Sequence, residues 1–251
     1  MGHTMEGKTA LVTGAGSGIG RSIALAFGEQ RATVVVSDIS KKGGDETVDL
    51  IAGSGGKAVF MPCDVSETKD VQILIGNIVR DFGTLDYACN NAGIHNPGTE
   101  FLPDADENIW DRIIAVNLKG VFLCMKYEVH AMLKQKYGVI VNISSMSGLL
   151  AEPGSYAYAA SKHGVMGLTK TAAFEFAKSG IRINAVCPAA VDTPGFAEAP
   201  PKFRQKYIDS NPMGRLARPE EIAAAVMWLC SDLAGFVTGT GLIIDGGVSA
   251  I

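Results

Sequence analysis

Short apolar runs alternate with longer amphipathic stretches along most of the chain. The runs are rich in Val, Ile and Leu, and several are continuously apolar, which is typical of strands in a parallel sheet that is covered on both faces. We therefore predict strands at residues 8–12, 33–37, 58–61, 85–90, 138–143, 182–187 and 242–245.

The stretches between these runs have the length and pattern of helices. The predicted helices cover residues 18–29, 41–54, 67–82, 106–136, 156–179 and 219–231. The last begins with Pro219, Glu220 and Glu221, an order that favours a helix N-terminus. The alternation of strand and helix predicts an α/β fold, a doubly wound Rossmann fold with a mainly parallel seven-stranded sheet. Because no linker, repeat or low-complexity tract divides the chain, we expect residues 1–251 to form a single domain.

Residues 189–213 depart from this rhythm. They follow the sixth predicted strand and contain Pro194, Pro200, Pro201 and Pro212. Long irregular segments in compact domains are usually lids or binding loops, and doubly wound sheets bind ligands at the carboxyl ends of their strands. We predict that residues 189–213 form a substrate-binding loop.

Composition argues against several classes of function. The 251 residues are 47% hydrophobic with a formal net charge of −4, whereas nucleic-acid binding usually needs a basic face. No run approaches the roughly 20 apolar residues of a membrane span, and the polar first eight residues argue against a signal peptide. We expect a cytoplasmic protein without nucleic-acid or membrane partners. Met5 is an alternative start, which would make residues 1–4 an added leader.

The five cysteines form no Cys-x-x-Cys pair, and their number is odd. A zinc site or a disulfide framework is therefore not expected, and buried free thiols in a reducing compartment are the preferred interpretation. His95 and His130 lack partners at metal-ligand spacing, so no metal site is predicted.

A glycine-rich turn, residues 13–20, joins the first predicted strand to the first helix. Gly14, Gly18 and Gly20 permit a tight turn, and the helix N-terminus offers free N–H groups to a phosphate. The spacing Gly-x-x-x-Gly-x-Gly differs from that of the common dinucleotide fingerprint, but the strand-turn-helix context still indicates a nucleotide.

Asp38 ends the second predicted strand, 18 residues after the turn. An acidic residue near this distance binds the ribose 2′-hydroxyl, and it would repel the 2′-phosphate of NADP. Neither Ser17 nor Ile39 is a cation that would pair with such a phosphate, although Lys41 and Lys42 lie close. The sequence therefore favours NAD, with NADP less favoured.

Two further strand ends offer polar groups to a cofactor. Asp64 and Val65 follow the third predicted strand and would place a carboxylate near an adenine amino group. Residues 90–93, with the sequence Asn-Asn-Ala-Gly, end the fourth strand and would turn the chain beneath the cofactor.

Tyr158 and Lys162 are four residues apart, which places them on one face of a predicted helix. An ammonium beside a phenol favours the phenolate, so we expect Lys162 to lower the pKa of Tyr158 from about 10 towards the working range of an acid/base catalyst. Tyr156 has Ala160 at the equivalent position and is interpreted as a packing residue. Together with the glycine turn, the Tyr/Lys pair indicates a nicotinamide-dependent oxidoreductase.

Taken together, these motifs resemble the short-chain dehydrogenase/reductase family over nearly the whole chain. Residues 13–20 are similar to its cofactor turn, and residues 188–193 to its Pro-Gly-x-x-x-Thr segment, with Ala189 in place of Gly. The resemblance implies the catalytic residues Asn117, Ser145, Tyr158 and Lys162. The implied cofactor-binding residues are Gly14, Ser17, Gly18, Ile19, Gly20, Asp38, Asp64, Val65, Asn91, Ala92, Gly93, Tyr158, Lys162, Pro188, Val191 and Thr193.

The resemblance also implies a role for each catalytic residue. Tyr158 would exchange a proton with the substrate oxygen, and Lys162 would lower the Tyr158 pKa and bind the nicotinamide ribose. Ser145 would hold the substrate oxygen, and Asn117 would hold a water near Lys162 in a proton relay. A homotetramer, formed through the two long central helices and the C-terminal strand, is a further implication.

The favoured function is an NAD(H)-dependent oxidoreductase that interconverts a secondary alcohol and a ketone, with a small cyclic or aliphatic alcohol slightly preferred. A 3-oxoacyl-(acyl-carrier-protein) reductase and a sugar or steroid dehydrogenase stay open as alternatives. A non-catalytic cofactor-binding protein ranks lower because all four catalytic residues are present. A sugar-nucleotide epimerase or dehydratase also ranks lower, because those relatives tend to have a larger C-terminal region.

Overall fold

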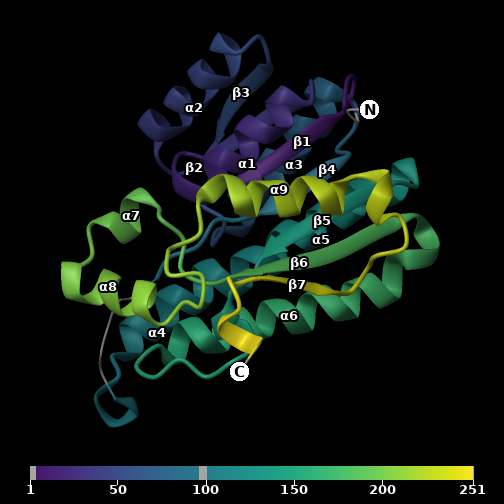
Figure 1. Ribbon diagram of the computed structural model, residues 1–251. Coiled ribbons are helices and arrows are strands. Elements are labelled where there is room, and N and C mark those ends of the chain that lie inside the picture. Colours follow the sequence, from purple (N-terminus) through teal and green to yellow (C-terminus); the bar gives the residue numbers. More distant parts are fainter. Residues whose placement is uncertain (1–3, 96–100, 251) are drawn as a thin grey trace.

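The computed structural model describes residues 4–95 and 101–250, and its seven strands form one sheet (Figure 1). The strand order is β3-β2-β1-β4-β5-β6-β7, and every neighbouring pair is parallel. The strands are β1 (Thr9–Thr13), β2 (Thr33–Asp38), β3 (Lys57–Pro62), β4 (Tyr87–Asn90), β5 (Gly138–Ile143), β6 (Ile181–Pro188) and β7 (Gly241–Ile244). The predicted doubly wound fold is confirmed. The suggested leader at residues 1–4 falls largely outside the described residues.

Helices cover both faces of the sheet (Figure 1). On one face pack α1 (Gly18–Glu29), α2 (Lys41–Gly53) and α9 (Pro219–Cys230). On the other pack α3 (Thr68–Phe82), α5 (Gly120–Gln135) and α6 (Tyr156–Phe176). The strand order reverses direction between β1 and β4, which is where a fold of this type forms a crevice at the carboxyl ends of its strands.

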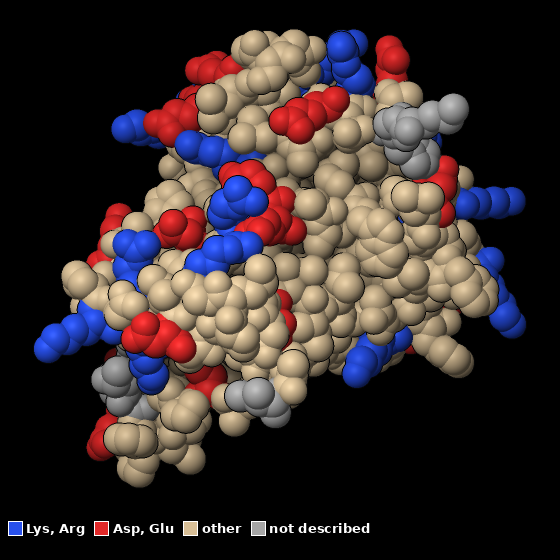
Figure 2. Space-filling model, viewed as in Figure 1, with Lys and Arg blue, Asp and Glu red and all other residues tan. Residues whose placement is uncertain are grey.

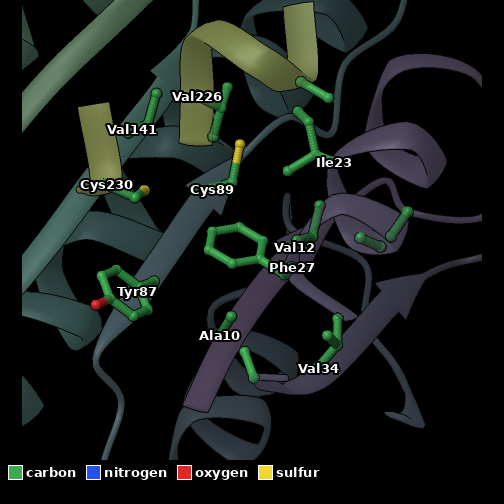
Figure 3. Close-up of a cluster of buried hydrophobic side chains, with 14 of the residues drawn as sticks. Ala10, Val12, Ile23, Phe27, Val34, Tyr87, Cys89, Val141, Val226 and Cys230 are labelled. Atoms are coloured by element: carbon green, nitrogen blue, oxygen red, sulfur yellow. The ribbon is translucent and has the colours of Figure 1, made fainter. Parts of the chain in front are cut away.

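Alternate residues of β1, β2, β4 and β5 fill two separate cores. Val12 of β1 and Cys89 of β4 pack with Phe27 of α1 and Val226 of α9, all fully buried (Figure 3). Leu11, the neighbour of Val12, belongs to the core on the opposite face. Successive side chains of a strand point to opposite faces, so a strand that is apolar throughout supplies both cores.

The predicted helix over residues 106–136 is wrong as a single element. The structure has α4 (Glu107–Ile113), a π-helical segment (Ile114–Lys119) and then α5. The π turn lies at the position where the Asn117 side chain bonds to the chain after β4 rather than facing solvent. Such π turns frequently occur at functional sites.

The prediction that residues 189–213 are irregular is also wrong in part. They contain α7 (Pro194–Ala197) and α8 (Pro201–Asp209). Pro194 and Pro201 occupy the first position of these helices, where a missing N–H has no effect on the hydrogen bonding. Two of the four prolines that indicated a loop therefore begin short helices.

Glu128, on α5, carries a carboxyl group that is fully buried in the protein core. It accepts a hydrogen bond from Asn90 Nδ2 at 3.0 Å, and the same nitrogen donates to Asn142 Oδ1 at 3.0 Å. Burial raises the pKa of Glu128 to about 7, while the Asn90 hydrogen bond lowers it by a smaller amount. The neutral form therefore dominates below about pH 7 in the folded protein.

Replacing Glu128 by Gln is expected to remove a pH dependence of stability. The folded pKa is about 7 and the ordinary value is 4.5, so the folded state holds a proton that the unfolded state releases in this window. The free energy of unfolding of the wild type should therefore fall by roughly 3 kcal/mol between pH 4.5 and pH 7, and this fall should be absent from Glu128→Gln. Urea titrations at pH 5 and pH 8 measure it, with the exposed Glu175→Gln as control. An equal stability difference between wild type and Glu128→Gln at both pH values would contradict the prediction.

Candidate active site

A cavity of about 1200 Å³ opens at the carboxyl ends of the strands. Every residue predicted to bind the cofactor lines it, and so does Ser145, so segments far apart in sequence converge here. Asn117 is buried behind the cavity wall. This convergence at the switch in strand order is the arrangement that the sequence predicted.

The glycine turn shapes one end of the cavity. Gly14 and Gly18 have φ angles of +62° and +52°, which side chains rarely adopt. A Cβ at Gly20 would lie 2.1 Å from the Gly14 carbonyl oxygen, so the turn packs directly on the start of α1. Ser17 is the N-cap of α1, but its side chain makes no capping hydrogen bond, and the first turn carries no acidic residue. The first N–H groups of α1 are therefore open to an anion, and the turn fits a dinucleotide phosphate.

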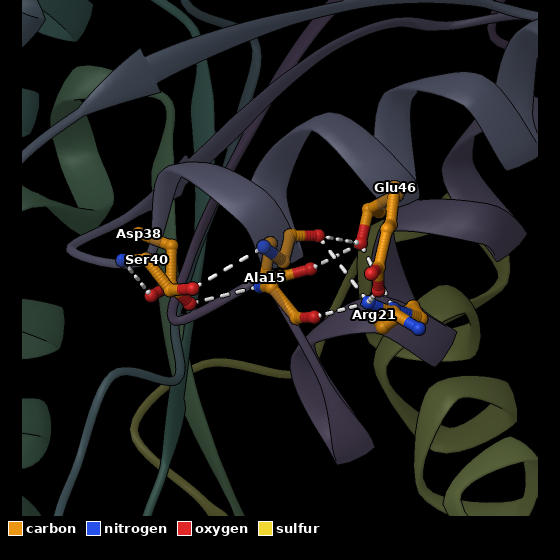
Figure 4. Close-up of polar contacts among 8 residues, drawn as sticks. Ala15, Arg21, Asp38, Ser40 and Glu46 are labelled. Carbon is orange, nitrogen blue, oxygen red and sulfur yellow. Dashed lines mark hydrogen bonds and ion pairs between the residues drawn. The ribbon is translucent and has the colours of Figure 1, made fainter.

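Asp38 reaches from the end of β2 to the glycine turn (Figure 4). Its Oδ2 accepts from the Gly16 N–H at 2.8 Å, and its Oδ1 accepts from the Ser40 N–H at 2.8 Å. The two bonds fix the carboxylate beside the turn, where the ribose of a dinucleotide would lie.

Arg21 lies on the opposite side of Ala15 from Asp38 (Figure 4). Its guanidinium donates to the Gly16 carbonyl and to Thr47 Oγ1, and it pairs with Glu46 at 2.9 Å. Lys41, at the start of α2, pairs with Asp45 at 2.6 Å on the surface. Arg21 and Lys41 therefore already have carboxylate partners.

The ends of β3 and β4 reach the same cavity. Asp64 and Val65 line it, and Ser66 donates to Asp64 Oδ1 through both its N–H and its hydroxyl. Asn91 Nδ2 donates to the carbonyls of Thr13 at 3.0 Å and Gly14 at 3.1 Å, which ties the end of β4 to the glycine turn.

Ser145, Tyr158 and Lys162 line the cavity beyond this turn. Ser145 follows β5, and the two other residues extend from α6. Lys162 is 4% exposed, its Nζ donates to the Ile143 carbonyl at 2.8 Å, and it stands 5.5 Å from the centre of the Tyr158 ring. A phenol, an ammonium and a hydroxyl thus share one partly desolvated space.

Asn117 holds the chain that follows β4. Its Oδ1 accepts from the Ile94 N–H at 2.8 Å, and its Nδ2 donates to the Ile94 carbonyl at 2.8 Å. Both ends of the amide are therefore paired with backbone, and the side chain fixes the loop next to Lys162. Its part in a water relay stays a prediction.

Comparison with known proteins gives a family match and several relatives. A family profile described as "Enoyl-(Acyl carrier protein) reductase" matches residues 14–249. A cyclohexanol dehydrogenase from Acinetobacter sp. (strain SE19) is 44% identical over 247 residues, covering 98% of this chain and 96% of that protein. A 3-oxoacyl-(acyl-carrier-protein) reductase from Thermotoga maritima is 41% identical over 244 residues, covering 97% of this chain and 98% of that protein.

The solved structure of levodione reductase superposes with a TM-score of 0.93 at 33% identity, covering 98% of both chains. This chain belongs to the short-chain dehydrogenase/reductase family. The Tyr158/Lys162 pair and the glycine turn, which suggested that family, therefore lie in a fold that the family shares.

In this short-chain dehydrogenase/reductase, the prediction that Lys162 lowers the pKa of Tyr158 is wrong. Burial raises the pKa of Tyr158 to about 12, with Glu152 acting in the same direction and Ser145 against it. Burial also lowers the pKa of Lys162 to about 8. Because the Lys162 ammonium donates to Ile143 rather than to the phenol, desolvation decides the Tyr158 pKa.

The segment after β6 closes the cavity on one side. Val191 pairs with Ala217 in an isolated bridge, and Thr193 caps α7 by accepting from Phe196 N–H at 3.3 Å. The Thr193 side chain also lies 3.2 Å from where a Cβ of Gly18 would be, so this segment touches the glycine turn. Pro188 lines the cavity at the end of β6.

Two cavity residues, His95 and Glu152, were not predicted as part of the site. The His95 ring lies edge-on to the Tyr158 ring, with centroids 4.6 Å apart, and burial lowers its pKa. Glu152 accepts from the Tyr207 hydroxyl at 2.9 Å. Tyr207 belongs to the predicted substrate-binding loop, residues 189–213, whereas no motif or spacing in the sequence indicated a role for His95 or Glu152. Within the described residues, no group of three His, Cys, Asp or Glu side chains is arranged to hold a metal ion.

Replacing Gly20 by Ala is expected to weaken cofactor binding at least about tenfold and to lower the free energy of unfolding by about 2 kcal/mol, because the new methyl would overlap the Gly14 carbonyl. NADH fluorescence titration and thermal unfolding measure the two effects. Gly76→Ala is the matched control, since Gly76 is an exposed α3 residue with no atom near its would-be Cβ, and that change should stabilise slightly. Unchanged NADH affinity in Gly20→Ala would show that the turn does not hold the dinucleotide.

Proposed function

We propose that this protein is an NAD(H)-dependent oxidoreductase that interconverts a secondary alcohol and a ketone. The observation that carries the proposal is the convergence of Ser145, Tyr158 and Lys162 in the cavity that the glycine turn also lines. A non-catalytic cofactor-binding role has less support, because the cavity holds the phenol, the ammonium and the hydroxyl together.

The proposed mechanism assigns one task to each side chain. A bound nicotinamide dinucleotide supplies the hydride acceptor or donor. The Ser145 hydroxyl holds the substrate oxygen, and the Tyr158 hydroxyl gives a proton to that oxygen in ketone reduction or takes one in alcohol oxidation. With a pKa raised to about 12, free Tyr158 is a neutral phenol that can donate in ketone reduction, and it must first lose this proton to solvent before it can take one in alcohol oxidation. Lys162 binds the nicotinamide ribose and steadies the negative charge that develops on Tyr158. Asn117 fixes the adjoining loop.

The choice of NAD rests on Asp38. A carboxylate fixed by Gly16 and Ser40 can accept from a ribose 2′-hydroxyl and would repel a 2′-phosphate. Arg21 and Lys41 are engaged by Glu46 and Asp45, which leaves neither prepared to pair with that phosphate.

A secondary alcohol on a small ring is the favoured substrate class, in keeping with the relative named as a cyclohexanol dehydrogenase. Phe196, Phe203 and Tyr207 form an aromatic cluster with ring centroids 5.0 to 6.1 Å apart, which supplies an apolar wall. The second candidate is reduction of a 3-oxoacyl thioester on a carrier protein, supported by the relative of that name at 41% identity.

Absorbance of NADH during turnover tests these proposals. A panel of secondary alcohols and ketones, with a 3-oxoacyl thioester included, is assayed with NAD(H) and NADP(H) in parallel. Turnover of an alcohol with NAD is expected. Activity confined to NADPH and the thioester would replace the first candidate by the second.

We propose that the protein assembles as a homotetramer. On the face in Figure 2, a broad area without charged side chains covers β7 and the end of α9. Leu233 and Phe236, which lie between α9 and β7 in the chain, have almost fully exposed apolar side chains, and Phe174 of α6 is 91% exposed. Exposed apolar patches often mark interfaces between protein chains. Light scattering after gel filtration tests the tetramer.

We also propose a cytoplasmic location. It is supported by the five cysteines, all of which are free and buried. None of the helices formed by the described residues has the length and apolar character needed to cross a bilayer. Figure 2 shows acidic and basic side chains interspersed on that face, in keeping with the prediction that nucleic acid is not a partner.

A further inference from the structure

A carboxylate lies in the cavity wall without a role in the proposed hydride transfer. Glu152 is partly buried and follows the short helical turn after Ser145. Its Oε1 accepts from the Tyr207 hydroxyl of α8 at 2.9 Å, and its Oε2 accepts from the Ser147 hydroxyl. Ser145 Oγ in turn donates to Ser147 Oγ at 3.2 Å. Two hydrogen bonds thus connect Glu152 to the hydroxyl that would hold the reacting oxygen of the substrate.

No cation neutralises this carboxylate among the described residues. The described Lys and Arg residues that line the cavity are Arg112 and Lys162, and neither forms an ion pair with Glu152. Lys162 donates instead to the Ile143 carbonyl. Glu198 adds a second carboxylate to the lining. An anionic substituent on the substrate would therefore be repelled at this end of the cavity.

The hydrogen-bonding capacity of Glu152 is only partly used. An ionised carboxylate offers about four lone-pair sites, and the hydroxyls of Tyr207 and Ser147 take two. The nearby rings of Phe196 and Phe203 bring no donor. A donor from the substrate would complete the set. Because Lys162 already supplies a cation to the same cavity and two hydroxyls share the charge of Glu152, a neutral hydroxyl suits the position better than an ammonium.

We infer that Glu152 is a specificity-determining residue that binds a second hydroxyl of the substrate, so that the preferred substrate is a diol or polyol. The inference rests on the proposed alcohol oxidation and narrows it to a class of substrate. Ser145 holds the oxygen that reacts, and Glu152 accepts from a hydroxyl a few carbons away. The apolar wall covers the carbon skeleton between the two hydroxyls.

Kinetics with matched six-membered rings test the inference. Cyclohexanol and the 1,2-, 1,3- and 1,4-cyclohexanediols are compared with NAD as cofactor. In the wild type, at least one diol is expected to exceed cyclohexanol in kcat/KM on the order of ten- to a hundredfold, the range for a hydrogen bond to a charged acceptor. Glu152→Gln should bring that ratio close to one. The exposed Glu175→Gln is the control and should keep the wild-type ratio.

Tyr207→Phe separates recognition from a merely structural role. It removes one partner of Glu152 and leaves the carboxylate, so it should keep the diol preference. The quenching of NADH fluorescence by the preferred diol gives a binding readout for the same variants, and far-UV circular dichroism checks their folding. A loss of preference in Tyr207→Phe equal to that in Glu152→Gln would overturn the inference, because it would show that the network only holds α8.

The remaining outcomes distinguish the inference from the function on which it rests. Turnover of cyclohexanol without preference for any diol overturns the role of Glu152 and leaves the oxidoreductase proposal in place. Preference for 4-aminocyclohexanol over every diol likewise overturns the assignment to a hydroxyl. Absence of turnover for every alcohol and ketone with either cofactor overturns the proposed function itself, and the inference with it.

Discussion

Tyr158→Phe is expected to lower kcat on the order of a thousandfold while NADH binds within about threefold of the wild-type affinity. The change removes the one hydroxyl proposed to exchange a proton with the substrate oxygen, and general acid–base catalysis typically contributes 10²- to 10⁴-fold. The ring that packs against His95 remains, so the shape of the cavity is kept. Steady-state turnover and NADH fluorescence titration measure the two quantities.

Tyr156→Phe is the matched control for this change. Tyr156 lies two residues earlier in α6, and unlike Tyr158 it does not line the large cavity but only a small pocket beside Trp110. Its phenol should be dispensable for turnover. Wild-type rates in Tyr158→Phe would remove Tyr158 from the chemistry, and equal losses in the two variants would point to damage to α6 instead.

The fold was predictable because most of its strands are short, largely apolar runs that stand out in the sequence. A run such as residues 138–143, apolar apart from Asn142, contributes to two cores at once, and the predicted bounds of β5 match the structure. Local sequence patterns were less informative where a side chain bonds to a residue far away in the chain. The π turn at Asn117 depends on bonds to Ile94, 23 residues earlier in the chain, which no periodicity records.

The candidate site was predictable to the extent that its residues belong to motifs. The glycine turn, Asp38 and the Tyr158/Lys162 pair each have a spacing that carries a physical reason, and all of them line one cavity. Glu152 lacks such a spacing, because its partners come from separate parts of the chain. The Tyr158 pKa also depends on burial, so a rule based on the neighbouring Lys162 alone gave the wrong direction.

The proposed preference for NAD depends on electrostatics at a single carboxylate, that of Asp38. A hydrogen bond from the ribose 2′-hydroxyl to Asp38 would contribute about 1.5–3 kcal/mol towards NAD, the range for a charged acceptor. A 2′-phosphate would instead meet this charge at close range, where two unit charges 4 Å apart repel by about 4 kcal/mol near a protein surface. Both effects favour NAD, and both disappear when the carboxylate is removed.

The two energies sum to about 5.5–7 kcal/mol, but water and salt screen a large part of that sum at the partly exposed Asp38. Asp38→Ala is therefore expected to shift the ratio of kcat/KM for NAD over NADP by roughly 10²- to 10³-fold towards NADP. Some stability should be lost as well, because the N–H groups of Gly16 and Ser40 lose their acceptor. Asp38→Asn is the informative control: it removes the charge but keeps the size of the side chain and one acceptor oxygen, which serves one of the two N–H groups, so it too should relieve the repulsion of NADP. Adding Ile39→Arg to Asp38→Ala should raise NADP use further, since Ile39 is exposed at the cavity and a guanidinium there can meet the phosphate. Parallel kinetics with both cofactors decide the matter, and an unaltered ratio in Asp38→Ala would place the ribose away from β2.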